Sequence, residues 1–286
     1  MEKTEKNKVE KSTLYLVGTP IGNLSDMSDR AKKVLSEVDF IAAEDTRNSM
    51  KLLSCFGIHA ELVSYHEHNK RESGERILAR LLSGESCALI TDAGMPAISD
   101  PGEDMVRLCA DSGIAVRVIP GPSACVSALA LSGLATQRFA FEGFLPAQKN
   151  ERKKRLESLK HETRTMMFYE APHKLKSTLS DMTDVFGAGR KISICRELTK
   201  INEETLRITL GESLSYYQEK EPRGEYVLIL EGGSENESEE SPLITLSPEE
   251  HVAHYEALGM KKMDAIKAAA KDRGLSKSEF YKMLVE

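Results

Sequence analysis

The sequence predicts a two-domain α/β protein with a parallel N-terminal sheet, a mixed second sheet and a small C-terminal helical unit. Up to residue 121, short apolar runs alternate with segments of helical spacing, which is the pattern of a parallel sheet. Further on, the predicted strands lie closer together and alternate less regularly with helices, which indicates a mixed sheet. An acidic segment at 232–241 contains no apolar residue and precedes three helical segments.

In the first domain, expected over residues 13–121, each apolar run ends in a loop that leads into a helix. The charged residues 1–12 before it are expected to form a disordered tail. Strands are predicted at 13–18, 40–43, 61–65, 87–91 and 115–119. Helices are predicted at 28–39, 49–56 and 71–82, with a fourth of about three turns before the last strand.

The second domain is expected over residues 122–231, and it begins with a small, apolar helix at 124–132. Its strands are predicted at 138–144, 165–169, 191–196, 205–210 and 226–231, and its other helices at 149–160, 172–185 and 212–219. A flexible linker, 232–242, leads to the C-terminal unit, 243–286. Its helices are predicted at 248–258, 261–271 and 276–285, and the last two have the length and turn of a helix-turn-helix, which either binds nucleic acid or docks on the body.

Composition indicates a soluble, intracellular globular protein. The 286 residues are 40% hydrophobic and 29% charged, no apolar run reaches the ~18 residues of a membrane span, and the charged start lacks a signal peptide's apolar segment. Five scattered cysteines without a CxxC pair indicate reduced, mostly buried thiols, with neither a disulfide framework nor a metal site. The net charge of −6 argues against a protein that coats nucleic acid, although 149–155 and 261–277 are locally basic.

Two loops in the first domain, TDAGMPAISDPG after residue 90 and PGPSA after residue 119, are candidates for a ligand site. Both follow predicted parallel strands, so they should meet at the carboxyl edge of the sheet. The chain has no GxxxxGK[ST] or GxGxxG string, which excludes the usual phosphate-binding loops. Exposed backbone groups, Asp92, Ser99 and Ser123 suit a folded ligand that combines an amino acid with adenosine. The alternative is that both loops are only tight turns.

Eight strings in order then carry a resemblance to a known family. They are VGTPIGNLSDMSDRA (17–31), AAEDTRNS (42–49), SYHEHN (64–69), TDAGMPAISDPG (91–102), PGPSA (120–124), FYEAPHKL (168–175), CRELTK (195–200) and PRGEYVLIL (222–230). Together they resemble the bacterial small-subunit ribosomal RNA 2′-O-ribose methyltransferases of the tetrapyrrole methylase superfamily. The resemblance implies that superfamily's two-domain fold, the cofactor S-adenosylmethionine, a cytidine ribose in the decoding region as substrate, a cytoplasmic location and a homodimer.

With the resemblance, the cofactor is expected between the two domains. The residues expected to bind it are Pro20, Asp92, Ala93, Gly94, Met95, Ser99, Ser123, Ala124, Phe168, Tyr169, Glu197, Leu198 and Gly224.

Polar residues that follow four predicted strands are candidates for catalysis. Transfer of a methyl group to a ribose hydroxyl is helped by a base, and the candidates are Glu44, His66 and Glu170. In an extended segment His66 and His68 would point to opposite sides. The cations Arg47, Lys174, Arg196 and Lys200 are expected to position the RNA backbone. The alternative is that they form internal ion pairs, for instance between Arg47 and either Glu44 or Asp45.

Two other functions remain open from the sequence. The first is methylation of a tetrapyrrole, because the superfamily shares the sheet and the cofactor loops. The second is a non-catalytic RNA-binding protein, which would need only basic surface and the C-terminal helices.

Overall fold

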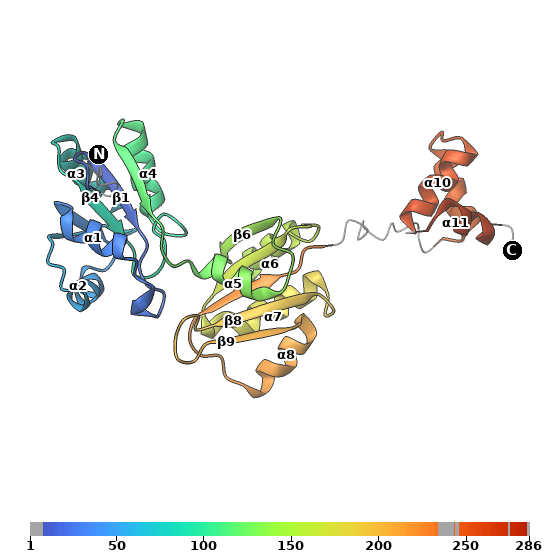
Figure 1. Cartoon of the computed structure of the whole chain (residues 1–286). Coiled ribbons are helices and arrows are strands. Elements are labelled where there is room, and N and C mark those ends of the chain that lie inside the picture. Colours follow the sequence, from blue (N-terminus) through green and yellow to red (C-terminus); the bar gives the residue numbers. More distant parts are fainter. Residues whose placement is uncertain (1–7, 234–242, 244–245, 274, 285–286) are drawn as a thin grey trace, which may run out of the picture.

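The computed structural model describes residues 8–233, 243, 246–273 and 275–284. Two five-stranded sheets follow each other along the chain, and three helices come after the second sheet (Figure 1). The predicted α/β class, with a parallel first sheet and a mixed second sheet, is confirmed.

All neighbouring strands of the first sheet run parallel, in the order β3-β2-β4-β1-β5. Successive residues of a strand face opposite sides, so Tyr15 packs with α1 and α2 whereas Leu14 packs with α3 and α4. Both faces are therefore covered by helices, as the apolar strands predict. The strands are β1 (Thr13–Val17), β2 (Phe40–Ala43), β3 (Leu62–Ser64), β4 (Cys87–Ile90) and β5 (Ala115–Ile119). The helices are α1 (Asp29–Glu37), α2 (Thr46–Cys55), α3 (Lys70–Leu82) and α4 (Gly102–Asp111), with a short 3-10 turn at Leu24–Asp26 that the sequence did not predict.

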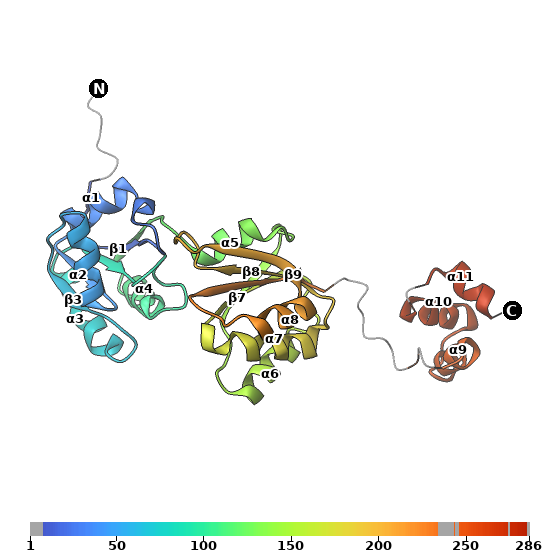
Figure 2. The ribbon, with the colours of Figure 1, turned by 90° about the horizontal axis from the view of Figure 1, so that it is seen from below.

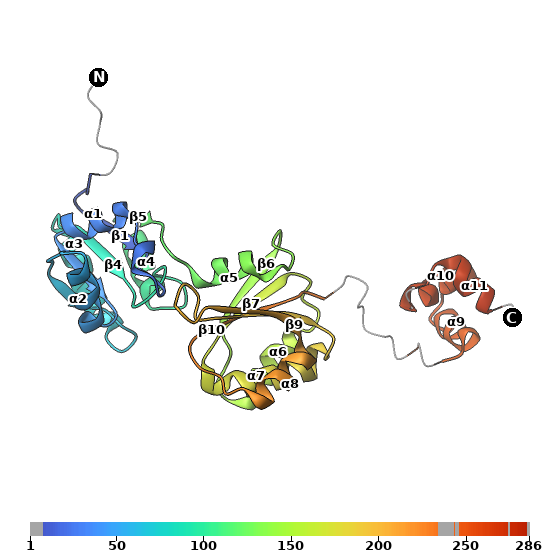
Figure 3. The ribbon, with the colours of Figure 1, turned by 60° about the horizontal axis from the view of Figure 1, so that its bottom comes forward.

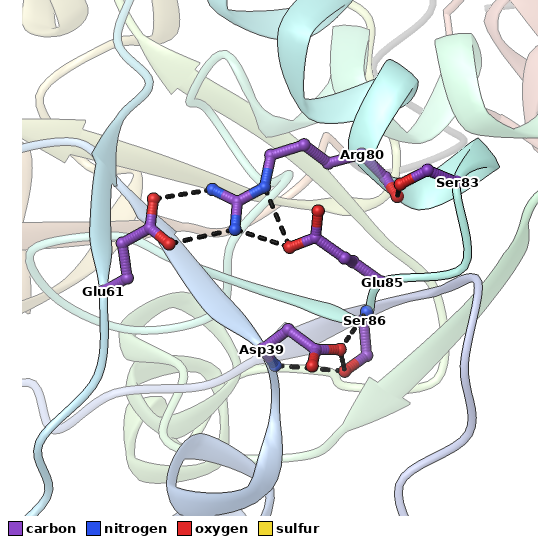
Figure 4. Close-up of polar contacts among 6 residues, drawn as sticks. All are labelled: Asp39, Glu61, Arg80, Ser83, Glu85 and Ser86. Atoms are coloured by element: carbon purple, nitrogen blue, oxygen red, sulfur yellow. Dashed lines mark hydrogen bonds and ion pairs between the residues drawn. The ribbon is translucent and has the colours of Figure 1, made fainter.

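Ion pairs and hydrogen bonds join the starts of three strands at the amino edge of this sheet (Figure 4). Arg80 on α3 donates to both carboxylate oxygens of Glu61, at 2.7 and 2.9 Å, and its Nε donates to Glu85 at 3.0 Å. Asp39 accepts hydrogen bonds from the backbone and the hydroxyl of Ser86, both at 2.7 Å. The polar contacts at this edge are thus made within the protein, and the carboxyl edge is the one open to a ligand.

The second sheet has the order β6-β7-β10-β8-β9, in which only β6 and β7 run parallel. Helices α6, α7 and α8 cover one face and α5 covers the other (Figures 2 and 3). The strands are β6 (Phe139–Phe144), β7 (Thr165–Glu170), β8 (Lys191–Arg196), β9 (Glu204–Thr209) and β10 (Tyr226–Leu230). The helices are α5 (Ala124–Ser132), α6 (Lys149–Ser158), α7 (Pro172–Phe186) and α8 (Leu210–Glu219).

Two segments that we expected to be flexible make specific contacts. Residues 8–12 belong to the predicted disordered tail, yet Val9 packs on the first core and Glu10 forms an ion pair with Arg117 at 2.7 Å. At the start of the predicted linker, Gly232 has no room for a side chain beside Thr163, and the backbone N–H of Gly233 donates to Glu162 at 2.7 Å. The ordered body therefore reaches from residue 8 to residue 233. The rest of the tail (1–7) and of the linker (234–242) lies outside the described residues.

Three helices form the predicted C-terminal unit: α9 (Pro248–Ala257), α10 (Lys262–Asp272) and α11 (Lys277–Met283). They pack around Val252, Ile266 and Phe280 and form a cluster of their own (Figures 1 and 2). The fully buried His251 holds α10 to α9, because its Nε2 lies 3.1 Å from Asp272 and its Nδ1 accepts a hydrogen bond of 3.1 Å from Arg273. This unit therefore has its own apolar core.

The part of the chain that the structure describes contains no helix that is long and apolar enough to cross a membrane. Among the same residues, no group of three or more His, Cys, Asp or Glu side chains is placed to hold a metal ion. All five cysteines are free thiols and four of them are buried, as predicted.

Candidate active site between the two sheets

A cavity of about 660 Å³ lies at the carboxyl edge of the first sheet and is closed on its other side by the second sheet. Both domains line it, so it corresponds to the site predicted between them. Of the predicted site residues, the cavity is lined by Glu44, Asp92, Ala93, Gly94, Met95, Ser99, Ser123, Ala124, Tyr169, Glu170 and Leu198.

The loop after β4 forms one wall and is held in an unusual backbone conformation. Gly94, Ala97 and Ser99 have φ values of 88°, 67° and 63°, a region that non-glycine residues rarely adopt. The Asp100 carboxylate compensates by accepting hydrogen bonds from the backbone N–H groups of Ala97, Ile98 and Gly102, at 3.0, 3.1 and 2.7 Å. One turn centred on the half-buried Asp100 carboxylate thus fixes the shape of this wall.

The loop between β5 and α5 forms the adjoining wall and lies against the end of β1. Gly18 and Gly121 approach so closely that neither has room for a Cβ atom. Past this contact, Ser123 and Ala124 reach the cavity at the first residues of α5. The two predicted ligand loops are therefore brought together, as the parallel strands require.

The second sheet contributes one aromatic and several apolar side chains. Tyr169 on β7 lines the cavity, with ring contacts to Phe141 and Phe144 at centroid distances of 5.1 and 5.4 Å. Burial raises the pKa of the Tyr169 hydroxyl, so this group stays protonated and can donate a hydrogen bond. Phe168 was wrongly predicted to contact the cofactor, because it points to the opposite face of β7 and is completely buried among α6 to α8.

The three predicted base candidates differ in their surroundings. Glu44 lies on the cavity wall, where partial desolvation and then the nearby charges of Asp92 and Asp100 raise its pKa. Glu170 also lines the cavity, but its two oxygens already accept hydrogen bonds, from the Thr178 hydroxyl at 2.6 Å and from the next backbone N–H at 2.8 Å. Of these two glutamates, Glu44 is therefore the better candidate for a base that a substrate can reach.

His66 does not line the cavity, and its neighbourhood differs from the one we expected. Residues 67–69 form a turn, so the rings of His66 and His68 meet at a centroid distance of 5.9 Å instead of pointing to opposite sides. The backbone N–H of His66 donates to Asn69 at 2.8 Å, and its Nδ1 is buried without a hydrogen-bond partner in the described part of the chain. The extended geometry that we expected for this segment is therefore wrong, and His66 is not among the residues that line the cavity.

Most of the predicted RNA-positioning cations form ion pairs. Arg47 pairs with Asp45 at 3.0 Å and remains exposed, as the alternative reading of the sequence foresaw. Arg196 pairs with Glu204 at 3.1 Å. Lys200 contacts Glu197 at 2.9 Å and Glu225 at 2.7 Å.

Three other residues predicted to bind the cofactor do not line the main cavity. Glu197 accepts hydrogen bonds from Lys200 and from the backbone of Glu225, and Gly224 is a glycine because a side chain would collide with Glu197. These two residues support the cavity wall at Glu225. Pro20 lines a smaller recess next to the cavity.

About half of the residues that line the cavity were not predicted from the sequence. Some of these residues directly follow predicted ones, as Asp100 follows Ser99, and His173 lies within the string FYEAPHKL that carries the family resemblance. Others depend on long-range pairing, because Tyr226 and Val227 reach the site only through the central position of β10. The missed lining residues are Ile21, Thr91, Ile98, Asp100, Phe144, Ala171, Pro172, His173, Cys195, Glu225, Tyr226 and Val227.

Comparison with known proteins identifies relatives along nearly the whole chain. The family model described as Tetrapyrrole (Corrin/Porphyrin) Methylases matches residues 13–213. The chain is 52% identical over 273 residues to the ribosomal RNA small subunit methyltransferase I of Halalkalibacterium halodurans, covering 95% of this chain and 94% of the relative. It is 49% identical over 276 residues to the protein of the same name from Bacillus subtilis, covering 96% and 94%.

Solved structures with the same fold are more distant in sequence. Cobalt precorrin-4 methyltransferase superposes with a TM-score of 0.57 at 16% identity and covers 77% of this chain and 95% of that one. Diphthine synthase gives a TM-score of 0.59 at 14% identity, covering 77% and 90%. At this identity the likeness concerns the fold.

Proposed function

The chain belongs to the tetrapyrrole methylase family, and from this premise we propose that it methylates the ribose 2′-hydroxyl of a cytidine in the decoding region of small-subunit ribosomal RNA. It is an S-adenosylmethionine-dependent methyltransferase. The observation that supports the RNA substrate is the identity of about half of all residues to relatives named for ribosomal RNA. We also propose that the protein acts in the bacterial cytoplasm, where ribosomal RNA is found.

The residues around the cavity suit S-adenosylmethionine. This ligand supplies an activated methyl group on a positively charged sulfur, and its size suits a cavity of about 660 Å³. Three carboxylates, Glu44, Asp92 and Asp100, stand on one side and favour a cation. Gly94 and Ala124 have small side chains or none, and Tyr169 and Leu198 line the cavity from the second domain. The space between these residues suits a flat adenosine.

Glu44 is our candidate for the base that accepts the proton of the ribose hydroxyl. The new bond forms between the hydroxyl oxygen and the methyl carbon, the bond from that carbon to sulfur breaks, and the ribose proton passes to the Glu44 carboxylate. A raised pKa makes Glu44 a stronger base than an ordinary carboxylate. Most of the rate then depends on holding the hydroxyl in line with the methyl group, which is the role of the cavity walls.

The function is tested by following a tritiated methyl group from S-adenosylmethionine. We expect label in small-subunit RNA, in a dinucleotide that resists alkaline hydrolysis, because methylation of the 2′-oxygen blocks cleavage. Release of the label by alkali as a base-methylated mononucleotide would contradict the ribose assignment. Labelling of a tetrapyrrole with unlabelled RNA would favour the other branch of the family.

We further propose that two copies of the chain associate through helix α5. This helix is apolar except for Ser127 and Ser132. Cys125 and Leu129 pack on the second sheet, whereas Val126 and Leu131 on its outer side are 54% and 38% exposed. A helix with so few polar residues is normally covered on all sides, and a second copy would cover this one. Light scattering should give twice the chain mass, and Val126→Lys should give a folded monomer. A parent protein that is monomeric at micromolar concentration would exclude this association.

A further inference from the structure

A small recess of about 170 Å³ adjoins the main cavity between the loop after β1 and the first turn of α2. Thr91 and Asp92 line both spaces, so a ligand in the recess would lie next to one in the cavity. The recess has about a quarter of the volume of the cavity, or that of roughly six water molecules. It therefore has room for a single six-membered ring.

The lining of the recess combines apolar surfaces with a few polar groups, as ligand sites do. Pro20, Leu24 and Leu52 offer flat or aliphatic contacts to the faces of a ring. Ser49 also lines the recess, and its buried hydroxyl has no hydrogen-bond partner within the described residues. An unpartnered buried hydroxyl lowers the stability of the folded protein, so it requires an explanation such as a bound ligand.

A hydrogen bond between Asn48 and Asp92 determines which of their atoms can still accept a hydrogen bond from a ligand. Asn48 donates from its amide nitrogen to the Asp92 carboxylate at 3.0 Å. The negative charge of Asp92 holds the amide in this orientation, because the reverse would place two oxygens together. With its nitrogen engaged by Asp92, Asn48 has its oxygen left as an acceptor. The recess therefore has two acceptor groups in its lining, this amide oxygen and the Asp92 carboxylate, which suit a ring that carries an amino group.

We propose that this recess receives the base of the target cytidine and recognises its exocyclic amino group through Asn48 and Asp92. The inference rests on the proposed function, since it places the base beside the cavity in which the ribose meets the methyl group. Bases of single-stranded RNA are recognised when they turn out of the stack into such sites. Uridine carries a carbonyl oxygen where cytidine carries the amino group, and that oxygen would face the two acceptors of the recess.

The first test compares small-subunit RNA that carries cytidine or uridine at the target position. The parent protein should methylate the cytidine RNA with kcat/KM at least roughly 10²-fold higher, because the uridine leaves polar groups unpaired. In Asn48→Ala this ratio should fall to within about tenfold. If Asn48 only positions Asp92, both substrates should lose rate equally and the ratio should persist, which would overturn the proposal.

The second test fills the recess. Leu52→Phe should raise KM for cytidine RNA about tenfold or more. Calorimetric affinity for S-adenosylmethionine should stay unchanged. Leu82→Phe is the matched control, because Leu82 is exposed at the end of α3, and we expect parent kinetics from it. Equal losses of RNA methylation and cofactor affinity in Leu52→Phe would assign the recess to the cofactor and contradict the proposal.

Ser49→Ala separates recognition from folding. It removes the unpartnered hydroxyl, so the melting temperature should not fall, whereas KM for the RNA should rise several-fold. Parent kinetics in both Ser49→Ala and Leu52→Phe would overturn the proposal while leaving the methyltransferase function intact. If the parent protein itself fails to methylate any cytidine of the RNA, the proposed function fails and this inference with it.

Discussion

A Cβ atom on Gly121 would lie 2.8 Å from the Cα of Gly18, so the loop after β5 touches the end of β1 backbone to backbone. Both ligand loops of the first domain depend on this contact for their spacing. Because neither partner is a flexible side chain, one of the two loops has to move if a side chain is introduced.

We therefore expect Gly121→Ala to lower the free energy of unfolding by about 1–3 kcal/mol and to weaken cofactor binding. Gly189→Ala is the control, because nothing lies within 4 Å of the added methyl group there. Denaturant unfolding and calorimetric titration measure the two effects. Equal stability of the two variants would show that the loop after β5 can shift to make room for the added methyl group without a loss of stability.

Glu44→Gln should lower kcat by roughly 10²–10⁴-fold with little change in cofactor affinity. In the parent protein, activity requires the ionised carboxylate. The raised pKa should therefore place the acid limb of the pH–rate profile above the ordinary glutamate value of 4.5. A parent-like rate in Glu44→Gln would exclude Glu44 as the base.

The same substitution should stabilise the protein at neutral pH. When the pKa of a carboxyl group is higher in the folded than in the unfolded state, the protein becomes less stable as pH rises through the two pKa values. The reason is that the carboxyl group ionises more readily in the unfolded state. Glu44→Gln removes that loss. Its melting temperature should exceed that of the parent at pH 7, and the difference should disappear well below pH 4.5, where Glu44 is protonated in both the folded and the unfolded state.

Arg80→Gln should destabilise the amino edge of the first sheet, by about 1–2 kcal/mol. Arg80 pairs with Glu61 and Glu85 (Figure 4), and its guanidinium also lies 3.7 Å from the centre of the Phe40 ring. Arg76→Gln is the control, since Arg76 reaches Glu72 only at 4.0 Å on an exposed helix face. Chemical denaturation should give a lower unfolding midpoint for Arg80→Gln than for Arg76→Gln. Equal midpoints would mean that the contacts of Arg80 add no measurable stability.

Truncation after Gly233 should leave a folded body that still binds S-adenosylmethionine. Every cavity-lining residue precedes this point, and the C-terminal unit has its own core. A body that folds and binds cofactor but no longer methylates subunits would assign substrate engagement to the C-terminal helices. Loss of folding would place a structural contribution beyond residue 233.

Neutralising the cations should distinguish RNA contacts from structural ion pairs. The exposed Arg47 is expected to contact a phosphate, so Arg47→Gln should flatten the dependence of log affinity on log salt by about one unit. Arg196→Gln should instead lower the melting temperature, because the Arg196 side chain is only 19% exposed and is paired with Glu204. An unchanged salt slope in Arg47→Gln, and likewise in Lys174→Gln and Lys200→Gln, would exclude the RNA role.

The helices and strands with bounds expected from the sequence were predicted to within a few residues, because their apolar residues recur at helical or strand spacing, but the 3-10 turn at Leu24–Asp26 was missed. It also located the two ligand loops, since parallel strands bring their carboxyl ends to one edge. It could not distinguish Phe168 from Tyr169, because both faces of β7 are apolar and only the packing of α6 to α8 decides which side faces the cavity. It misplaced His66 because a local turn, stabilised by Asn69, overrides the extended reading. Glu197 was predicted to bind the cofactor, but it accepts hydrogen bonds from Lys200 and from the backbone of Glu225. These contacts also depend on packing, which the sequence does not show.

The position of β10 between β7 and β8 bears on how the protein is made. The first sheet is complete once Ile119 has been synthesised, so this domain can fold while the rest of the chain is still on the ribosome. The second sheet lacks its middle strand until Leu230 has emerged, and until then β7 and β8 expose unpaired edges. The two domains therefore fold at different times during synthesis, and the first domain's half of the cofactor site forms more than a hundred residues before the second sheet is complete. A chain that ends prematurely before β10 should be prone to aggregate, because the edges of β7 and β8 stay unpaired.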